Sequence, residues 1–329
     1  MSEVDLPVAV DALGGDHAPD VLVAAALKAA RSGVLVRLVG DVSIPGRRRP
    51  NTLSILQRGT AFPADASPKT IRREPGTSIR LALREVAEGR ASSVFSAGPT
   101  GATLVASVLE LGVLPGVDRP AIASVLPRAD GGRLVVVDSG ANVDCRSEQL
   151  ANFAVLGSVF SEVLGTSAPR VGLLSIGEEA SKGNDQVRAA QLLLVEAPVH
   201  FVGNVEPTTA LSGACDVVVC DGFVGNIFLK TVEATAETVL TIARRELGRE
   251  PVAQVAAWLL QRRLRHLRTR LAWEATGGAL LLGVKGVVVV GHGRTGPDAA
   301  AAGIQMAKRA VADGLVGALE QRLGRTLGH

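Results

Sequence analysis

Short apolar runs alternate with longer amphipathic segments along almost the whole chain. Nine runs of four to seven residues, rich in Val, Leu and Ala, predict β-strands. These runs are Leu6–Ala12, Leu35–Val39, Ser93–Ser96, Ile122–Leu126, Leu134–Asp138, Val171–Ser175, Val199–Val202, Val217–Cys220 and Val287–Val290. Helical spacing of apolar residues predicts helices between them, including Asp20–Arg31, Ser78–Gly89, Thr100–Leu111, Glu148–Leu164 and Asp185–Val195. The alternation predicts an α/β fold in which helices cover both faces of a mostly parallel sheet.

Glycines and polar residues follow six of the predicted strands. The six turns begin at Asp11, Ser96, Asp138, Ile176, Asp221 and Gly291. Ligands of open parallel sheets bind outside the carboxyl ends of the strands, where glycine exposes backbone N–H groups and the next helix offers its positive N-terminus. We therefore expect the six turns to meet at one edge of the sheet and to hold an anion such as phosphate. The alternative reading is that Gly, Asn and Asp only make tight turns there.

Composition favours a globular protein with a large core. Of the 329 residues, 47% are hydrophobic and 20% are charged, which excludes a disordered chain. A formal charge of +3 and only 3% aromatic residues give no support for nucleic-acid binding. The N-terminus lacks a cleavable apolar stretch, and no run of about 20 apolar residues occurs, so we expect a cytoplasmic protein in one α/β/α unit over residues 1–329.

Common cofactor and metal motifs are absent from the sequence. There is no P-loop, no His-Glu-x-x-His and no Gly-x-Ser-x-Gly, and the five histidines lack metal-ligand spacing. The string Gly291–Gly296 matches a dinucleotide pattern, but the second strand and acidic residue that NAD binding requires do not follow it. We expect neither a cofactor nor a metal. The three cysteines sit in apolar surroundings, which predicts buried thiols in a reducing compartment.

Strings at these same turns resemble the bacterial acyl-ACP:phosphate acyltransferase family (PlsX). They occupy positions 10–16, 96–102, 118–121, 140–145, 177–184, 203–206, 220–231, 277–279 and 283–286. The resemblance implies an enzyme that moves a fatty acyl group from acyl carrier protein to inorganic phosphate, giving an acyl phosphate for phospholipid synthesis. It also implies a homodimer without a cofactor, in the fold of isocitrate and isopropylmalate dehydrogenases and phosphotransacetylases. The chain departs from the family pattern at Pro99, Thr276, Val290 and Arg294.

Two residues are the leading catalytic candidates, and the resemblance implies the same two. Lys182 lies in a glycine-flanked turn before a predicted helix, where an ammonium can bind phosphate, and Asn226 opens a helix after Gly225. Their alternative roles are a surface lysine and a helix N-cap. The further candidates for binding phosphate or substrate are Asp11, Gly15, His17, Gly98, Thr100, Asn142, Gly183, Asn184, Asp221, Gly222, Gly225 and His292.

Charge and protonation divide the supporting candidates. Asp11 and Asp221 would repel phosphate, so we expect them to orient hydrogen-bond donors. His17 or His292 could protonate the departing thiolate, and a structural role is the alternative for each.

The segment 251–273 predicts an inserted basic amphipathic helix. Leucines recur at helical spacing and five arginines crowd its second half. The helix could lie peripherally on the inner face of the cell membrane, contact acidic acyl carrier protein, or pack in a dimer; the resemblance favours the membrane.

Other functions stay open at this stage. They are a phosphate acetyl- or butyryltransferase that uses acyl-CoA, a decarboxylating dehydrogenase of the related fold, and a non-catalytic, membrane-associated paralogue that recruits acyl carrier protein.

Overall fold

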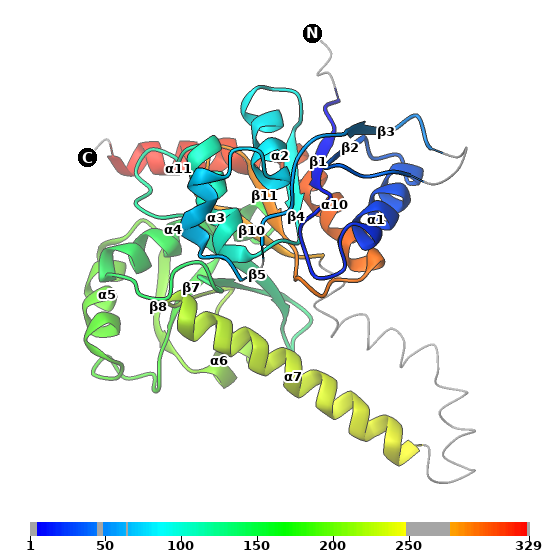
Figure 1. Ribbon diagram of the computed structural model, residues 1–329. Helices are drawn as coiled ribbons and strands as arrows, with labels where there is room; N and C mark the ends of the chain where they lie inside the picture. The colour runs from blue at the N-terminus through cyan, green and yellow to red at the C-terminus, as the bar shows by residue number, and fades with distance from the viewer. Residues whose placement is uncertain (1–4, 45–48, 64, 248–276, 328–329) are drawn as a thin grey trace.

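The computed structural model describes residues 5–44, 49–63, 65–247 and 277–327 (Figure 1). The segment 251–273 and Thr276 lie outside these ranges. Within them, eleven strands form one sheet in the order β3-β2-β1-β4-β11-β10-β5-β6-β9-β7-β8. The strands are β1 (Val8–Asp11), β2 (Val36–Val39), β3 (Leu53–Leu56), β4 (Ser93–Ser96), β5 (Ala121–Pro127), β6 (Arg133–Val137), β7 (Arg170–Leu174), β8 (His200–Val205), β9 (Val217–Val219), β10 (Ala279–Leu282) and β11 (Val287–Val290).

Helices cover both faces of this sheet. They are α1 (Asp20–Arg31), the 3₁₀ helix η1 (Pro68–Arg73), α2 (Ser78–Ala87), α3 (Thr100–Glu110), α4 (Ser147–Val163), α5 (Asp185–Glu196), α6 (Pro207–Ser212), α7 (Gly222–Leu247), α10 (Pro297–Ala312) and α11 (Leu315–Leu327). The mostly parallel α/β architecture confirms the predicted fold class. No helix of the described ranges is long and apolar enough to cross a bilayer.

The two halves of the sheet run in opposite directions. Strands β3, β2, β1, β4 and β11 are parallel to one another, and so are β6, β9, β7 and β8. Between the halves, β10 and β5 form three successive antiparallel pairs with their neighbours. The expectation that six strands end at one edge of the sheet is therefore wrong, because β10 and β5 reverse the strand direction between the halves.

Strand register nevertheless brings the two sets of carboxyl ends together. Val290, the last residue of β11, lies opposite Ala279 of β10. The next residue of β10, Leu280, lies opposite Ala123 of β5, which also faces Val137, the last residue of β6. The carboxyl ends of β11 and β6 thus lie at nearly the same height, with β10 and β5 between them. Loops that follow β11 and β6 consequently converge over β10 and β5.

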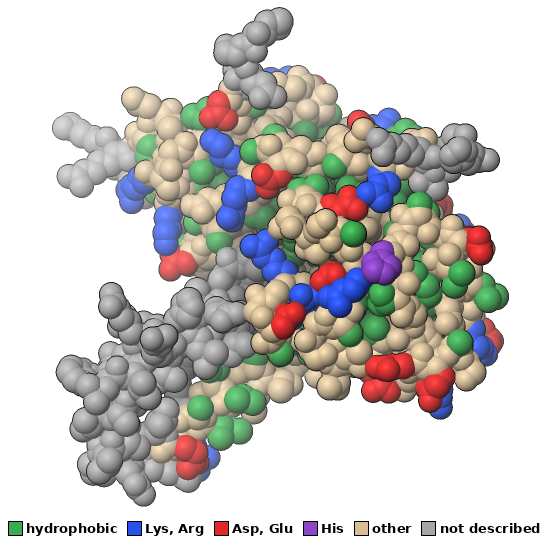
Figure 2. Space-filling model, turned by 180° about the vertical axis from the view of Figure 1, so that it is seen from behind, with side chains coloured by type: hydrophobic (Ala, Val, Ile, Leu, Met, Phe, Trp, Pro, Cys, Tyr) green, Lys and Arg blue, Asp and Glu red, His purple; other side chains and the backbone are tan. Residues whose placement is uncertain are grey.

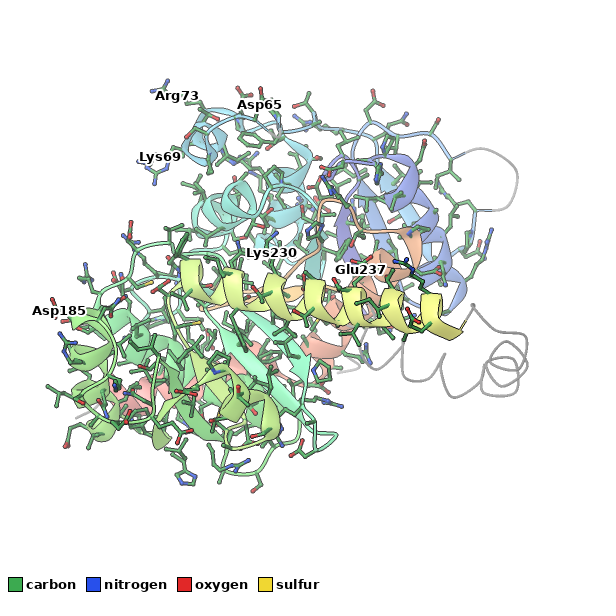
Figure 3. The ribbon with its side chains drawn as sticks, turned by 90° about the horizontal axis from the view of Figure 1, so that it is seen from below. Asp65, Lys69, Arg73, Asp185, Lys230 and Glu237 are labelled. Atoms are coloured by element: carbon green, nitrogen blue, oxygen red, sulfur yellow. The ribbon has the colours of Figure 1, made fainter. Side chains whose placement is uncertain are left out.

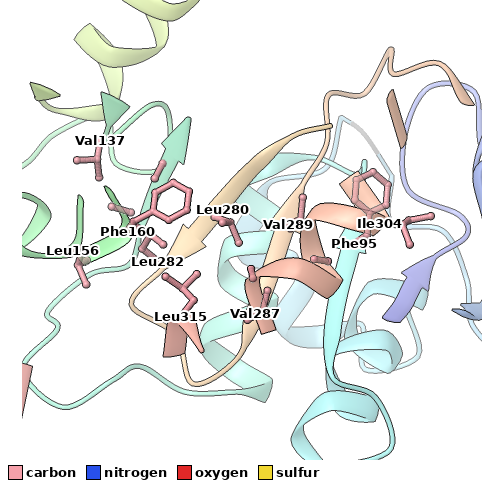
Figure 4. Close-up of a cluster of buried hydrophobic side chains, with 14 of the residues drawn as sticks. Phe95, Val137, Leu156, Phe160, Leu280, Leu282, Val287, Val289, Ile304 and Leu315 are labelled. Carbon is pink, nitrogen blue, oxygen red and sulfur yellow. The ribbon is translucent and has the colours of Figure 1, made fainter. Parts of the chain in front are cut away.

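The two faces of the sheet are packed differently. One face bears a continuous buried cluster beneath α1, α4, α10 and α11, in which Phe95, Leu280 and Val289 of adjacent strands meet Phe160 and Ile304 of the helices (Figure 4). The other face bears two separate clusters. One lies beneath α2 and α3, and the other joins β6 and β9 to α6 and α7. Such division leaves room for a cavity between the two clusters.

Helix α7 starts at the sheet and ends away from it. Figure 1 shows its outer part extending beyond the rest of the described chain. Two apolar side chains of this outer part, Val239 and Ile242, are 58% and 55% exposed. The inner part is buried at Gly222, Gly225 and Phe228, so the N-terminal part of α7 is anchored on the sheet.

Candidate active site

A cavity of about 800 Å³ lies between the two halves, over β5 and β10. This volume is within the range of about 300–1,000 Å³ that is common for small-molecule sites. The β11 half contributes Gly15, Asp16, Gly98, Pro99, Thr100 and His292, and the β6 half contributes Ser139, Gly140, Asn226, Leu229, Lys230 and Glu233. Phe62, Pro63, Ile122, Val125, Ala279 and Val290 add apolar wall. The cavity is thus polar at the loops and apolar along the sheet, which suits an acyl group joined to a polar one.

A buried carboxylate supports the turn after β4. The Oδ2 atom of Asp11 accepts a hydrogen bond of 2.7 Å from the hydroxyl of Ser96, and that hydroxyl accepts one of 3.1 Å from the backbone N–H of Gly98. Ser78 donates to the other carboxylate oxygen at 2.5 Å. Burial raises the pKa of Asp11 above its ordinary value, against the lowering effect of these hydrogen bonds. Asp11 therefore lies behind the cavity wall and positions Gly98.

The turn supported by Asp11 leads into an uncapped helix. Pro99 is the N-cap residue of α3 and makes no side-chain hydrogen bond to the first-turn amides. Thr100, the first residue of α3, and Gly98 both line the cavity. Unpaired N–H groups and the helix dipole favour an anion at this wall.

A second buried carboxylate, Asp138, supports the opposite wall. It accepts hydrogen bonds of 2.6–3.1 Å from the backbone N–H groups of Ile122, Gly140, Ala141 and Asn142 and from the Asn142 side-chain amide. Its side chain is fully buried, and this burial raises the pKa of the carboxyl despite the hydrogen bonds. Asp138 thereby joins the β6–α4 loop to β5.

The N-terminus of α7 is seated on the loop that Asp138 holds. The N–H of Gly222 donates to the carbonyl of Asn142 at 2.7 Å, and Asp221 caps the helix by accepting from the N–H of Val224 at 2.8 Å. Asn226 follows one turn later and lines the cavity beside Gly140. Within the described chain, the Asn226 amide makes no hydrogen bond to protein. Both of its N–H donors are available to a ligand.

Hydroxyl and imidazole groups complete the polar wall. The hydroxyls of Ser124 and Ser139 lie 2.8 Å apart, and Ser139 also donates to the carbonyl of Ile122 at 3.1 Å. The Nδ1 atom of His292 accepts from the N–H of Arg294 at 3.2 Å. A neutral His292 ring therefore carries its hydrogen on Nε2.

Comparison with known proteins gives the family. The model of the family described as "Fatty acid synthesis protein" matches residues 6–317. The chain belongs to this family. A phosphate acyltransferase of Nostoc punctiforme is 45% identical over 321 residues, covering 94% of each chain. One of Desulforudis audaxviator is 44% identical over 322 residues, covering 96% of each. The predicted family and the prediction of an acyltransferase enzyme are confirmed.

Solved structures support the fold of this fatty acid synthesis protein family member. A phosphotransacetylase from Streptococcus pyogenes is similar with a TM-score of 0.60 over 94% of each chain, at 16% identity. The EutD phosphotransacetylase from Staphylococcus aureus has a TM-score of 0.57 over 93% of this chain and 94% of its own, at 15% identity. At these identities the likeness concerns the fold alone, and the predicted phosphotransacetylase-like fold is confirmed.

The predicted site residues of this family member fall into three groups. Five of them line the cavity: Gly15, Gly98, Thr100, Asn226 and His292. A second group lies behind the wall and supports it: Asp11, Asn142, Asp221, Gly222 and Gly225. The third group lies outside the described wall: His17, Lys182, Gly183 and Asn184. Of these, His17 and Lys182 are exposed, and Asn184 caps α5 through a 2.9 Å bond from the N–H of Val187.

Several wall residues are not among the sequence-based candidates. Ser139 and Gly140 share a turn with Asn142, and Lys230 and Glu233 follow Asn226 at helical spacing. The local sequence could therefore have identified both pairs as wall residues. Ser124 lies inside an apolar strand, and no local pattern distinguishes it.

The described residues offer no metal site, and the thiols are largely shielded. They contain no group of three or more His, Cys, Asp or Glu side chains that could hold a metal ion. Cys215 and Cys220 are buried, and Cys145 is partly buried.

Proposed function

We propose that the protein transfers a fatty acyl group from acyl carrier protein to inorganic phosphate and releases acyl phosphate. The observation that carries the proposal is the joining of three features in one cavity: the uncapped N-terminus of α3, the free amide of Asn226 and an apolar wall. The names of the relatives from Nostoc and Desulforudis support phosphate as the acceptor.

The reaction requires no nucleophile from the protein. A phosphate oxygen attacks the thioester carbonyl carbon, the new C–O bond forms, and the C–S bond breaks. When the nucleophile is monohydrogen phosphate, its proton balances the thiol that leaves. The protein has to hold two anionic groups: the phosphate and the carbonyl oxygen, which gains charge during the attack. Fixed donors aimed at that oxygen dominate catalysis of this kind, and orientation of phosphate against the carbonyl adds to it.

Each demand matches a part of the cavity. The backbone N–H groups at Thr100 and the dipole of α3 suit the phosphate. The side-chain amide of Asn226 lies on the other wall of the same cavity and suits the developing oxyanion. Of the two histidine candidates for the leaving thiolate, His292 lines the cavity, whereas His17 lies outside the wall.

Lys182 stays in the proposal as a second catalytic residue. Its support is the family resemblance at positions 177–184 and the chemistry of an ammonium toward phosphate. The residue lies on the exposed loop between β7 and α5, where its backbone N–H donates to Glu179. Gly183 and Asn184 shape this loop, since Gly183 has a φ of +99° and Asn184 caps α5.

The partners belong to the same proposal. We propose acyl carrier protein as the acyl donor, a homodimer as the assembly, and contact of segment 251–273 with the inner face of the cell membrane. The exposed apolar residues Val239 and Ile242 on the outer part of α7 support contact with a further surface. On the face shown in Figure 2, basic and acidic side chains of the described residues are interspersed.

The decisive experiment measures thiol release from acyl-ACP with and without inorganic phosphate. We expect release that depends on phosphate and yields acyl phosphate, which hydroxylamine traps as the hydroxamate. Equal release without phosphate would exclude the proposed reaction. Acyl-CoA of the same chain length, tested in parallel, separates acyl carrier protein from CoA as the donor.

A further inference from the structure

Helix α7 brings a cation into the cavity beside Asn226. The wall residues of α7 are Asn226, Leu229, Lys230 and Glu233, which follow the spacing of one helical face. The other face is buried at Gly225 and Phe228. Lys230 comes four residues after Asn226, so its side chain is the neighbour of the Asn226 amide on the cavity side. Figure 3 shows Lys230 near the inner end of α7 and Glu237 further along the helix.

Lys230 is an exposed residue of the cavity wall. Lys230 is the one Lys or Arg among the described residues of the wall, which also includes the carboxylates of Asp16 and Glu233. Its ammonium forms no ion pair within 4.0 Å inside the described ranges. Lys28 and Lys308, by contrast, pair with carboxylates at 2.7 and 3.3 Å.

The opposite wall carries a helix N-terminus, and its carboxylate, Asp16, lies 3.9 Å from the guanidinium of Arg294. The uncapped first turn of α3 presents backbone N–H groups at Thr100. An ammonium on one side and a helix N-terminus on the other favour an anion held between them. Charge-assisted hydrogen bonds from an ammonium to a phosphate oxygen are about twice as strong as neutral ones.

We infer that Lys230 binds a phosphate oxygen in this cavity. Two sources supply that chemistry: the inorganic phosphate of the reaction, and the phosphodiester that joins the thiol arm of the acyl donor to its carrier. The assignment of either phosphate to a reaction rests on the proposed function, but the binding itself is measured without turnover.

Calorimetric titration tests the inference on the full-length protein. Inorganic phosphate is titrated into the wild type, Lys230→Met and Lys230→Arg, and 4′-phosphopantetheine and pantetheine are titrated in parallel. If the site holds the nucleophile, Lys230→Met should lower the affinity for inorganic phosphate by about 10- to 100-fold, and Lys230→Arg should retain most of that affinity. If it holds the donor arm, the same loss should affect 4′-phosphopantetheine but not pantetheine. Either result supports the inference and identifies the source.

Controls separate this inference from the proposed function. Lys285 is exposed in the β10–β11 turn outside the described wall, so Lys285→Met should bind both probes like the wild type. The inference is overturned if the wild type binds neither phosphate probe, or if Lys230→Met binds both as tightly as the wild type. Failure of the proposed function would instead appear as thiol release by the wild type that does not depend on phosphate. That result is independent of what Lys230→Met binds.

Discussion

A Cβ atom on Gly225 would lie 1.9 Å from the backbone carbonyl oxygen of Asp138. No real Cβ tolerates such an approach, so α7 can rest on the β6–α4 loop only with glycine at this position. Because Asn226 is the next residue, the same contact fixes the position of its side-chain amide in the cavity wall. The close approach links a backbone requirement to the geometry of the candidate site.

Gly225→Ala should therefore lower both stability and turnover. Displacing packed backbone typically costs about 1–3 kcal/mol, and movement of α7 would carry Asn226 away from the oxyanion position. The matched control is Gly317→Ala in α11, where an added Cβ meets nothing within 4 Å. That change should leave stability unchanged or raise it by up to about 1 kcal/mol. Thermal unfolding and phosphate-dependent thiol release measure both variants, and wild-type values for Gly225→Ala would refute the argument.

Replacement of the two catalytic candidates should lower turnover without unfolding the protein. Asn226→Ala removes a donor from the cavity wall, and we expect a loss of kcat of about 100- to 1,000-fold.

Lys182→Ala tests the residue that lies outside the described wall, and the proposal predicts a loss of kcat of at least about 10-fold. Neither side chain has a hydrogen bond to lose within the described ranges, so unfolding free energies should stay within about 0.5 kcal/mol. A Lys182→Ala enzyme with wild-type kinetics would remove Lys182 from the mechanism.

Local patterns predicted most of the fold, and tertiary pairing explains what they missed. The apolar runs at Ser93–Ser96 and Val287–Val290 coincide with β4 and β11. The apolar runs include neither β3 (Leu53–Leu56) nor β10, which spans only Ala279–Leu282 between glycines. Its antiparallel direction comes from pairing with β5 and β11, which no local sequence pattern contains.

The same limit applies to the site. Turn chemistry led to Gly98, Asn226 and His292, because glycine and polar residues at strand ends leave a local signal. Ser124 lies within a strand and meets the cavity only because register places it opposite Val136, near the end of β6. Lys182 illustrates the converse: its turn has the expected composition, yet the described cavity wall does not include it.

The cysteine thiols should react slowly in the native protein. Burial raises the pKa of Cys145 to about 12 and that of Cys215 to about 11, and it raises the pKa of Cys220 well above its ordinary value. At pH 8 a thiol of pKa about 11 is roughly one part in a thousand thiolate, the reactive form. Labelling with a disulfide reagent should be slow until urea unfolds the chain and exposes all three thiols. Labelling of the folded protein at the rate of free cysteine would contradict this.

Asp216 should stabilise the protein at neutral pH and lose that effect in acid. Although burial acts to raise its pKa, hydrogen bonds from Arg170 and Arg128 lower it to about 2. The unfolded chain should titrate near the ordinary value of 3.8. The folded state therefore binds fewer protons between these values, so the stabilisation is complete above pH 3.8 and falls away as pH drops toward 2.

Comparison of Asp216→Asn with the wild type isolates this contribution. The side chain is only 10% exposed, so solvent screens the pair little, and the pKa difference corresponds to about 2 kcal/mol at pH 7. Urea unfolding from pH 7 to pH 2 should show the variant less stable by about that amount above pH 5, with the difference shrinking below pH 4. Asp11 and Asp138, whose pKa values burial raises, act in the opposite sense, but they are present in both proteins and cancel in the comparison. A difference that stays constant over this pH range would show that the pKa of Asp216 is not lowered by its two arginines.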